Sequence, residues 1–77
     1  MDKEIHIGEL IKIKMKEEGR SVSWLASKMH CDRTNVYKIF QKASIDSAQL
    51  LRISCLLGCD FFSNYSNILN RNKGNGG

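Results

Sequence analysis

The chain contains no proline, only three cysteines and no long apolar run. Without proline, no position forces a break inside a helix. An odd number of cysteines, with no Cys-x-x-Cys pair, argues against both a disulfide framework and a zinc site. We therefore expect the cysteines to be small buried or half-buried residues, and we expect no metal or cofactor.

Signals for membranes and secretion are also missing. No apolar run reaches the length of a transmembrane helix. Residues 1–4 are charged and are not followed by the apolar core of a signal peptide. These absences predict a cytoplasmic protein that does not contact membranes.

Catalytic machinery is not visible in the sequence. No nucleophile, base and orienting residue occur together, and there is no phosphate-binding loop. Cys31 beside His30 is the best nominal nucleophile, but we expect Cys31 to point inward. A chain of 77 residues can bury only one modest core, which leaves little material for a deep substrate cleft. We therefore expect no enzyme.

The charge is concentrated in one segment. The chain carries a net charge of +4 and a pI near 9.2, which favours an acidic partner such as nucleic acid, an anionic membrane or an acidic protein. Residues 20–42 contain five basic residues and one acidic residue, Asp32, so the net charge of this segment is +4. This is the net charge of the whole chain, and the other residues sum to zero. The basic residues are Arg20, Lys28, Arg33, Lys38 and Lys42.

Apolar residues at helical spacing predict five helices and no strand. The first helix is expected over about 5–18, ended by Gly19, and Gly58 ends the fourth. Gln49 follows Asp46 at the spacing of a capping box. The expected N-caps of the second to fifth helices are Ser21, Asp32, Asp46 and Asp60.

The C-terminal part divides into an apolar segment and a polar tail. We expect one domain over 1–69 and a disordered, glycine- and asparagine-rich tail over 70–77. A small core does not have room for every apolar residue near the fifth helix. Some of them are expected in the core and the rest in a homodimer patch. These candidates are Phe61, Phe62, Tyr65, Ile68 and Leu69.

Residues 21–42 have the pattern of two helices that cross closely. A small residue, Ala26, stands in the middle of the first, with Leu25 before it and a polar helix from Asp32 to Ile39 after it. In these residues the chain resembles the phage-repressor superfamily of DNA-binding domains (Cro/cI-like, XRE-type helix-turn-helix), over roughly residues 7–65. The resemblance implies a compact, all-α, five-helix lambda-repressor-like domain whose helices 2 and 3 form the helix-turn-helix.

The chain departs from the family pattern at three places. His30 replaces the turn glycine, so a left-handed backbone is expected at a histidine. Val22 replaces a glutamine that contacts phosphate in relatives. Residues 40–42 read Phe-Gln-Lys where the family usually has Glu-Asn-Gly.

The resemblance also implies a DNA interface, with a recognition helix at about 32–42 in the major groove. Arg33 has the donors to pair with guanine, and Asn35 has the groups to pair with adenine. The expected base-contacting residues are Arg33, Thr34, Asn35, Tyr37 and Lys38. The expected phosphate-contacting residues are Ser21, Ser23, Lys42 and Ser44. Trp24 is expected to pack against a neighbouring helix rather than stack on a base.

These observations predict a small transcriptional regulator, a repressor rather than an activator, that binds double-stranded DNA sequence-specifically. One recognition helix reads few base pairs, so a homodimer on a palindromic operator is expected. The alternative is an antitoxin-like or adaptor module whose C-terminal aromatic patch binds a protein partner, with DNA binding secondary. Binding to RNA or a membrane surface by charge alone is a third option, but the mixed polarity of residues 32–42 argues against it.

Overall fold

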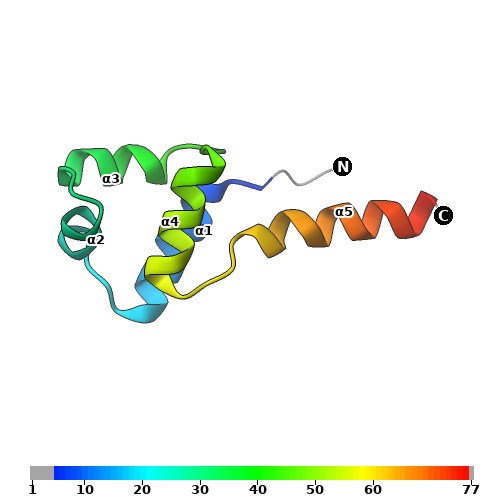
Figure 1. Cartoon of the computed structure of the whole chain (residues 1–77), viewed down its shortest axis with the longest axis horizontal. Coiled ribbons are helices and arrows are strands. Elements are labelled where there is room, and N and C mark those ends of the chain that lie inside the picture. Colours follow the sequence, from blue (N-terminus) through cyan, green and yellow to red (C-terminus); the bar gives the residue numbers. More distant parts are fainter. Residues whose placement is uncertain (1–4, 77) are drawn as a thin grey trace.

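Four helices enclose a single apolar core, and a fifth helix projects away from it (Figure 1). The computed structural model describes the backbone of residues 5–76 and the side chains of residues 5–70. Residues 5–76 form five helices and no strand, which confirms the predicted all-helical class. The helices are α1 (Ile7–Glu18), α2 (Val22–Lys28), α3 (Arg33–Phe40), α4 (Ser47–Leu57) and α5 (Phe62–Gly76).

The core forms because each of the first four helices has one apolar side. Buried residues recur three or four positions apart, which places them on one side of a helix with 3.6 residues per turn. Packing of these four sides together creates the core and leaves the polar sides in solvent. The buried apolar residues are Ile7, Ile11, Met15, Leu25, Ala26, Val36, Ile39, Phe40, Leu50, Ile53, Leu57 and Phe61.

Helix ends follow the sequence signals at most positions. Gly19 and Gly58 have left-handed backbones, with φ of 70° and 62°, and end α1 and α4 as predicted. The Ser21 hydroxyl accepts a hydrogen bond from the Trp24 amide at 3.0 Å. Asp46 accepts one from the Gln49 amide at 2.7 Å, which is the Asp46 half of the predicted capping box.

Asp32 is the N-cap of α3 as predicted, but two details of the predicted helix starts differ. Asp32 has the extended backbone of an N-cap, but its side chain makes no capping hydrogen bond. Its backbone carbonyl accepts the Asn35 amide at 3.0 Å. Helix α1 begins at Ile7 rather than at residue 5, because His6 is the N-cap and its Nδ1 accepts the Glu9 amide at 3.2 Å.

Helix α1 contacts the end of α3 backbone to backbone. The Ile7 amide donates to the Ala43 carbonyl, and the Gly8 amide donates to the Lys42 carbonyl, both at 2.9 Å. A Cβ atom at Gly8 would lie 2.3 Å from the Phe40 carbonyl oxygen, so only glycine fits here. This contact holds the connection that follows α3 against the first turn of α1.

Helix α5 leaves the body of the molecule after Phe61, the last buried core residue (Figure 1). The helix continues to Gly76, so residues 70–76 have helical backbone where their composition predicts disorder; Gly77 lies outside the described residues. No proline interrupts this stretch, so its backbone hydrogen bonding can continue. Within residues 5–76, no helix is both long enough and apolar enough to cross a membrane.

Candidate nucleic-acid interface

The turn between α2 and α3 is built around His30. Its backbone is left-handed, with φ of 56°, as predicted from the resemblance that puts His30 in place of a turn glycine. The His30 amide donates to the Ser27 carbonyl at 3.2 Å, and the Cys31 amide donates to the Ala26 carbonyl at 2.9 Å. This pair of bonds is a Schellman motif, which usually has glycine at the left-handed position. The motif ends α2 and lets α3 begin at Arg33 after a short connection.

Helix α3 has one side in the core and one side in solvent. Val36, Ile39 and Phe40 are buried, which fixes the rotation of the helix about its axis. The opposite side carries the predicted base-contacting residues, and all of them are exposed. They are Arg33, Thr34, Asn35, Tyr37 and Lys38. An α-helix with its side chains is about 10–12 Å in diameter, so α3 has a diameter that fits the DNA major groove, which is about 12 Å wide.

The exposed side of α3 divides into three rows by helical spacing. Thr34 and Lys38 are four residues apart and lie opposite the buried side. Arg33 and Tyr37 form a second row on one flank, and Asn35 lies on the other flank. The Tyr37 ring meets the Phe40 ring edge-on, with 6.2 Å between ring centres. This contact supports Tyr37, whose exposed fraction is 53%.

The predicted phosphate-contacting residues lie at two places. Ser21 and Ser23 are at the first turn of α2, and Lys42 and Ser44 are in the connection between α3 and α4; all four are exposed. The Ser21 oxygen already accepts the Trp24 amide, but the hydroxyl proton remains available to a phosphate. The connection that carries Lys42 and Ser44 is held against α1, because the Lys42 carbonyl accepts a hydrogen bond from the Gly8 amide.

A basic groove of about 380 Å³ lies between α3 and α4, on the Asn35 flank. Lys38 and Lys42 line it together with Arg52 of α4. The Arg52 guanidinium donates to the Lys28 carbonyl at 3.4 Å, which ties α4 to the end of α2. The sequence interpretation missed Arg52, because it stands between apolar residues and shows its position beside α3 only after folding.

A second groove, of about 590 Å³, lies on the Tyr37 flank between α3, α1 and the start of α2. Lys12 and Lys16 of α1 line this groove, and both side chains are exposed. The ion pairs in residues 5–70 involve one lysine of α1, Lys14. Within residues 5–70, Lys12 and Lys16 take part in no ion pair.

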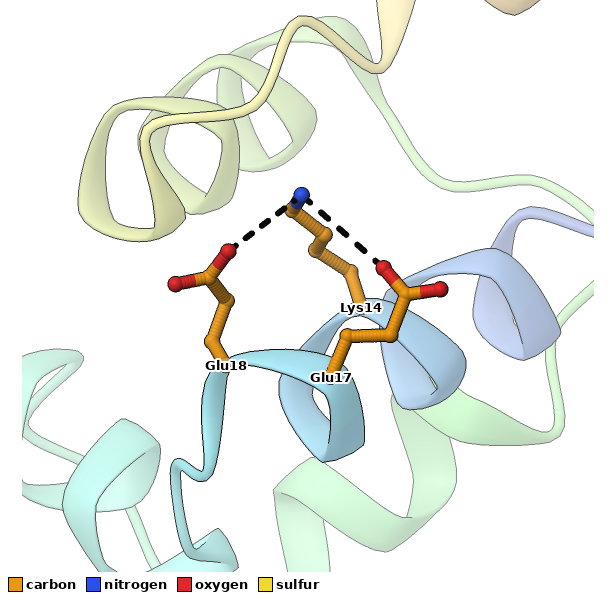
Figure 2. Close-up of polar contacts among 3 residues, drawn as sticks. All are labelled: Lys14, Glu17 and Glu18. Atoms are coloured by element: carbon orange, nitrogen blue, oxygen red, sulfur yellow. Dashed lines mark ion pairs between the residues drawn. The ribbon is translucent and has the colours of Figure 1, made fainter.

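Lys14 is paired with two glutamates on the same helix (Figure 2). Its Nζ lies 3.3 Å from Glu18 Oε2 and 4.0 Å from Glu17 Oε1. The hydrogen bond to Glu18, followed by its negative charge, raises the pKa of Lys14 above its usual 10.5. Lys14 is therefore charged at neutral pH, but its charge is compensated within α1.

Arg20 and Trp24 form a contact where α1 leads into α2. The Arg20 guanidinium carbon lies 4.4 Å from the centre of the Trp24 ring, which is a cation–π distance. Trp24 is half-buried and packs against the core, which confirms its predicted packing role. The stacking holds the Arg20 charge beside the first turn of α2.

The cysteines and histidines do not gather into a metal site in the part of the chain that the structure describes. All three cysteines are free. Cys31 and Cys59 are half-buried, as predicted, but Cys55 is exposed. Cys55 lies two residues after Ile53, which is on the buried side of α4, so helical rotation turns Cys55 toward solvent.

No protein family, no curated protein and no solved structure matches this chain. The residues and their geometry therefore provide the support for a function.

The predicted dimer residues separate into two groups. Phe61 is 2% exposed and belongs to the core, so it is not available for a patch. Phe62 is half-buried and packs against the core, because it is the first residue of α5. Ile68 is half-buried, while Tyr65 and Leu69 are 39% and 66% exposed. The remaining candidate surface is therefore on the projecting part of α5.

Proposed function

We propose that this protein binds double-stranded DNA sequence-specifically and acts as a small transcriptional regulator, a repressor. The observation that carries the proposal is the outer side of α3, where five polar or aromatic side chains are exposed on a helix whose other side is locked into the core. In this proposal α2, the His30 turn and α3 form a helix-turn-helix, and the five helices form a lambda-repressor-like domain.

The three rows on α3 suggest how bases are read. Thr34 and Lys38, in the central row, point farthest from the protein and would enter the major groove most deeply. Arg33 can donate two hydrogen bonds to guanine, and Asn35 can pair with adenine in the same bidentate way. Each such pair contributes about 1–3 kcal/mol of discrimination against the wrong base.

Basic and hydroxyl groups beside α3 would hold the DNA backbone in register. Lys42 and Arg52 line the groove on the Asn35 flank, Ser44 lies in the connection between α3 and α4, and Ser21 and Ser23 lie at the first turn of α2. Contacts to phosphates carry no sequence information, but they fix the position and orientation of the reading helix. Binding is therefore expected to weaken steeply with salt as counterions return to the DNA.

A homodimer would supply the specificity that one short helix lacks. Tyr65 and Leu69 expose apolar surface on α5, which projects from the body and is free of the α3 side (Figure 1). Pairing of this surface with that of a second copy would place two α3 helices on one DNA. Half-sites about 34 Å apart, or one helical turn, are then expected.

The same α5 surface supports a second candidate function, an antitoxin-like or adaptor module in which a different protein covers Tyr65 and Leu69. The mass of the purified chain in solution distinguishes the two. A concentration-dependent dimer favours the homodimer, whereas a monomer at all concentrations favours a different partner.

The DNA proposal is tested by selecting bound duplexes from a random DNA pool. The wild type is compared with Arg33→Ala and with Lys28→Ala, which removes one positive charge from an exposed residue outside the outer side of α3. We expect a two-fold symmetric motif for the wild type and for Lys28→Ala. With Arg33→Ala, one position per half-site should lose its preference, and affinity should fall by about 5- to 150-fold.

The opposite result is equally clear. If no motif is recovered and the three proteins bind all duplexes with the same salt dependence, the charge serves only non-specific contact. The proposed sequence-specific function would then be wrong.

A further inference from the structure

The groove on the Tyr37 flank of α3 has an apolar floor. Met15, Val22 and Phe40 line it, and Met15 and Phe40 belong to the core cluster. Tyr37 adds the side of an exposed ring. The volume of about 590 Å³ is within the range of sites that bind small molecules or short peptide segments, about 300–1,000 Å³.

One wall of this groove is a row of positive charges. Lys12 and Lys16 lie one turn apart on α1, Arg20 follows just after the end of this helix, and all three line the groove. Lys12 and Lys16 are exposed and about 6 Å apart along the helix axis. Arg20 is held by its contact with Trp24, 4.4 Å from the ring centre. No ion pair in residues 5–70 involves any of these three side chains.

Glu9 is the one acidic residue at the groove and lies toward the first turn of α1. The charged lining is therefore three cations against one anion. The positive charge is therefore concentrated at the end of the groove near Lys16 and Arg20.

We propose that this groove binds an acidic amphipathic segment of a partner protein. Apolar side chains of the segment would lie on Met15, Val22 and Phe40, and carboxylates one turn apart would meet Lys12 and Lys16. Spacing of three or four residues places apolar and acidic side chains on adjoining sides of a helix, so a helical peptide satisfies both walls.

Other ligands fit the groove less completely. A DNA strand would satisfy the cations but has no apolar side chains for the floor. A small anion would occupy one or two of the cations and leave the rest of the row unpaired. The combination of an apolar floor and an extended positive wall therefore favours a peptide.

The site has a consequence for DNA binding, and this consequence alone rests on the proposed function. Tyr37 lines the groove and also belongs to the exposed side of α3. A bound segment would cover Tyr37 and stand beside Arg33, one turn earlier on the same flank. The partner would then compete with DNA and act as an antagonist.

The test is selection of peptides from a displayed library of random linear peptides on the immobilised full chain, without DNA. Selected peptides are synthesised with a fluorescent label, and their affinities are measured by anisotropy. The wild type is compared with Lys12→Gln/Lys16→Gln and with Lys28→Glu. Both variants lower the net charge by two, but Lys28 does not line the groove. Far-UV circular dichroism checks that each variant is folded.

We expect peptides that combine Asp or Glu at three- to four-residue spacing with apolar residues. Their affinity should fall about tenfold in Lys12→Gln/Lys16→Gln and stay unchanged in Lys28→Glu. Amide chemical-shift changes should be confined to residues 6–22 and 37–41, which contain every residue that lines the groove.

The proposal is overturned if no peptide is enriched, if the variants bind equally, or if the shifts fall on another surface. It is also overturned if the Lys12→Gln/Lys16→Gln protein loses affinity for duplex DNA and no peptide is recovered, because the row would then serve the DNA backbone. Peptide binding is measured without DNA, so its failure is separate from failure of the DNA-binding proposal.

Discussion

Replacing Gly8 with alanine should destabilise the protein, although alanine is the better helix former. At an ordinary position near a helix start or interior, this change is favourable by about 0.5–1 kcal/mol. At Gly8 the added Cβ would lie 2.3 Å from the Phe40 oxygen and 2.4 Å from the Ile39 oxygen. Both oxygens belong to the backbone, so no side-chain rotation relieves the overlap.

The size of this destabilisation can be estimated from the separation of α1 and α3 that the new Cβ atom requires. Unstrained contacts are about 3.5 Å long, so α1 and α3 would have to separate by about 1 Å. Such overpacking costs about 1–3 kcal/mol. Separation also weakens the hydrogen bonds from Ile7 to Ala43 and from Gly8 to Lys42, each 2.9 Å long and contributing about 0.5–1.5 kcal/mol. After subtraction of the propensity gain, we expect a loss of about 1–5 kcal/mol.

Urea denaturation followed by circular dichroism and by Trp24 fluorescence measures this loss. A 77-residue domain has a total stability of about 4–12 kcal/mol, so the shift in midpoint should be large. Gly19→Ala is the matched control, since φ is 70° there and no atom lies within 4 Å of the new Cβ. Gly19→Ala should lower the free energy of unfolding by about 1–2 kcal/mol, because alanine is strained in the left-handed conformation. A Gly8→Ala protein as stable as the wild type would refute direct backbone contact between α1 and α3.

Three further changes test other parts of the structure. His30→Gly should raise the free energy of unfolding by about 0.5–1 kcal/mol, because glycine adopts a φ of 56° without steric penalty; an unchanged or lower urea midpoint would contradict this. Lys14→Gln removes the pair with Glu18. Because the folded-state pKa of Lys14 is raised above 10.5, the stabilisation is complete below that pH and is lost as pH rises through the folded-state value. The difference in thermal midpoint from the wild type should therefore persist at neutral pH and vanish in strongly alkaline buffer. Leu69→Glu should convert a wild-type dimer to monomer in sedimentation without loss of helix, since Leu69 is 66% exposed; a variant that still dimerises would place the interface elsewhere.

Local signals in the sequence were sufficient to predict most of the helices. Gly19, Gly58, Ser21 and Asp46 act through hydrogen bonds that span three to five residues, so their effect can be read without knowing the fold. The left-handed backbone at His30 was predicted from the family resemblance instead, because His30 stands where that pattern has a turn glycine. Helical spacing of apolar residues also predicted the buried sides, because packing only requires that each helix present one apolar side.

Sequence reasoning failed at the placement of individual side chains. Asp32 stands at the N-cap position of α3, but its side chain makes no capping hydrogen bond, and nothing in its sequence neighbours explains the difference from Ser21 and Asp46. Phe61 and Phe62 are adjacent and chemically identical, yet one is buried in the core and the other is half-buried at the start of α5. The direction in which the chain enters α5 decides between them, and no local pattern encodes that direction.

Contacts between distant segments were decided by the tertiary structure alone. The need for glycine at position 8 depends on the carbonyl groups that end α3, more than 30 residues away. Arg52 joins the surface beside α3 only because α4 packs there, and Lys12 and Lys16 face a groove only because α1 crosses α3. The sequence by itself determined the helices, their apolar sides and the exposed composition of α3. The surroundings of α3 depend on how the helices pack, because those contacts join residues that no short-range pattern relates.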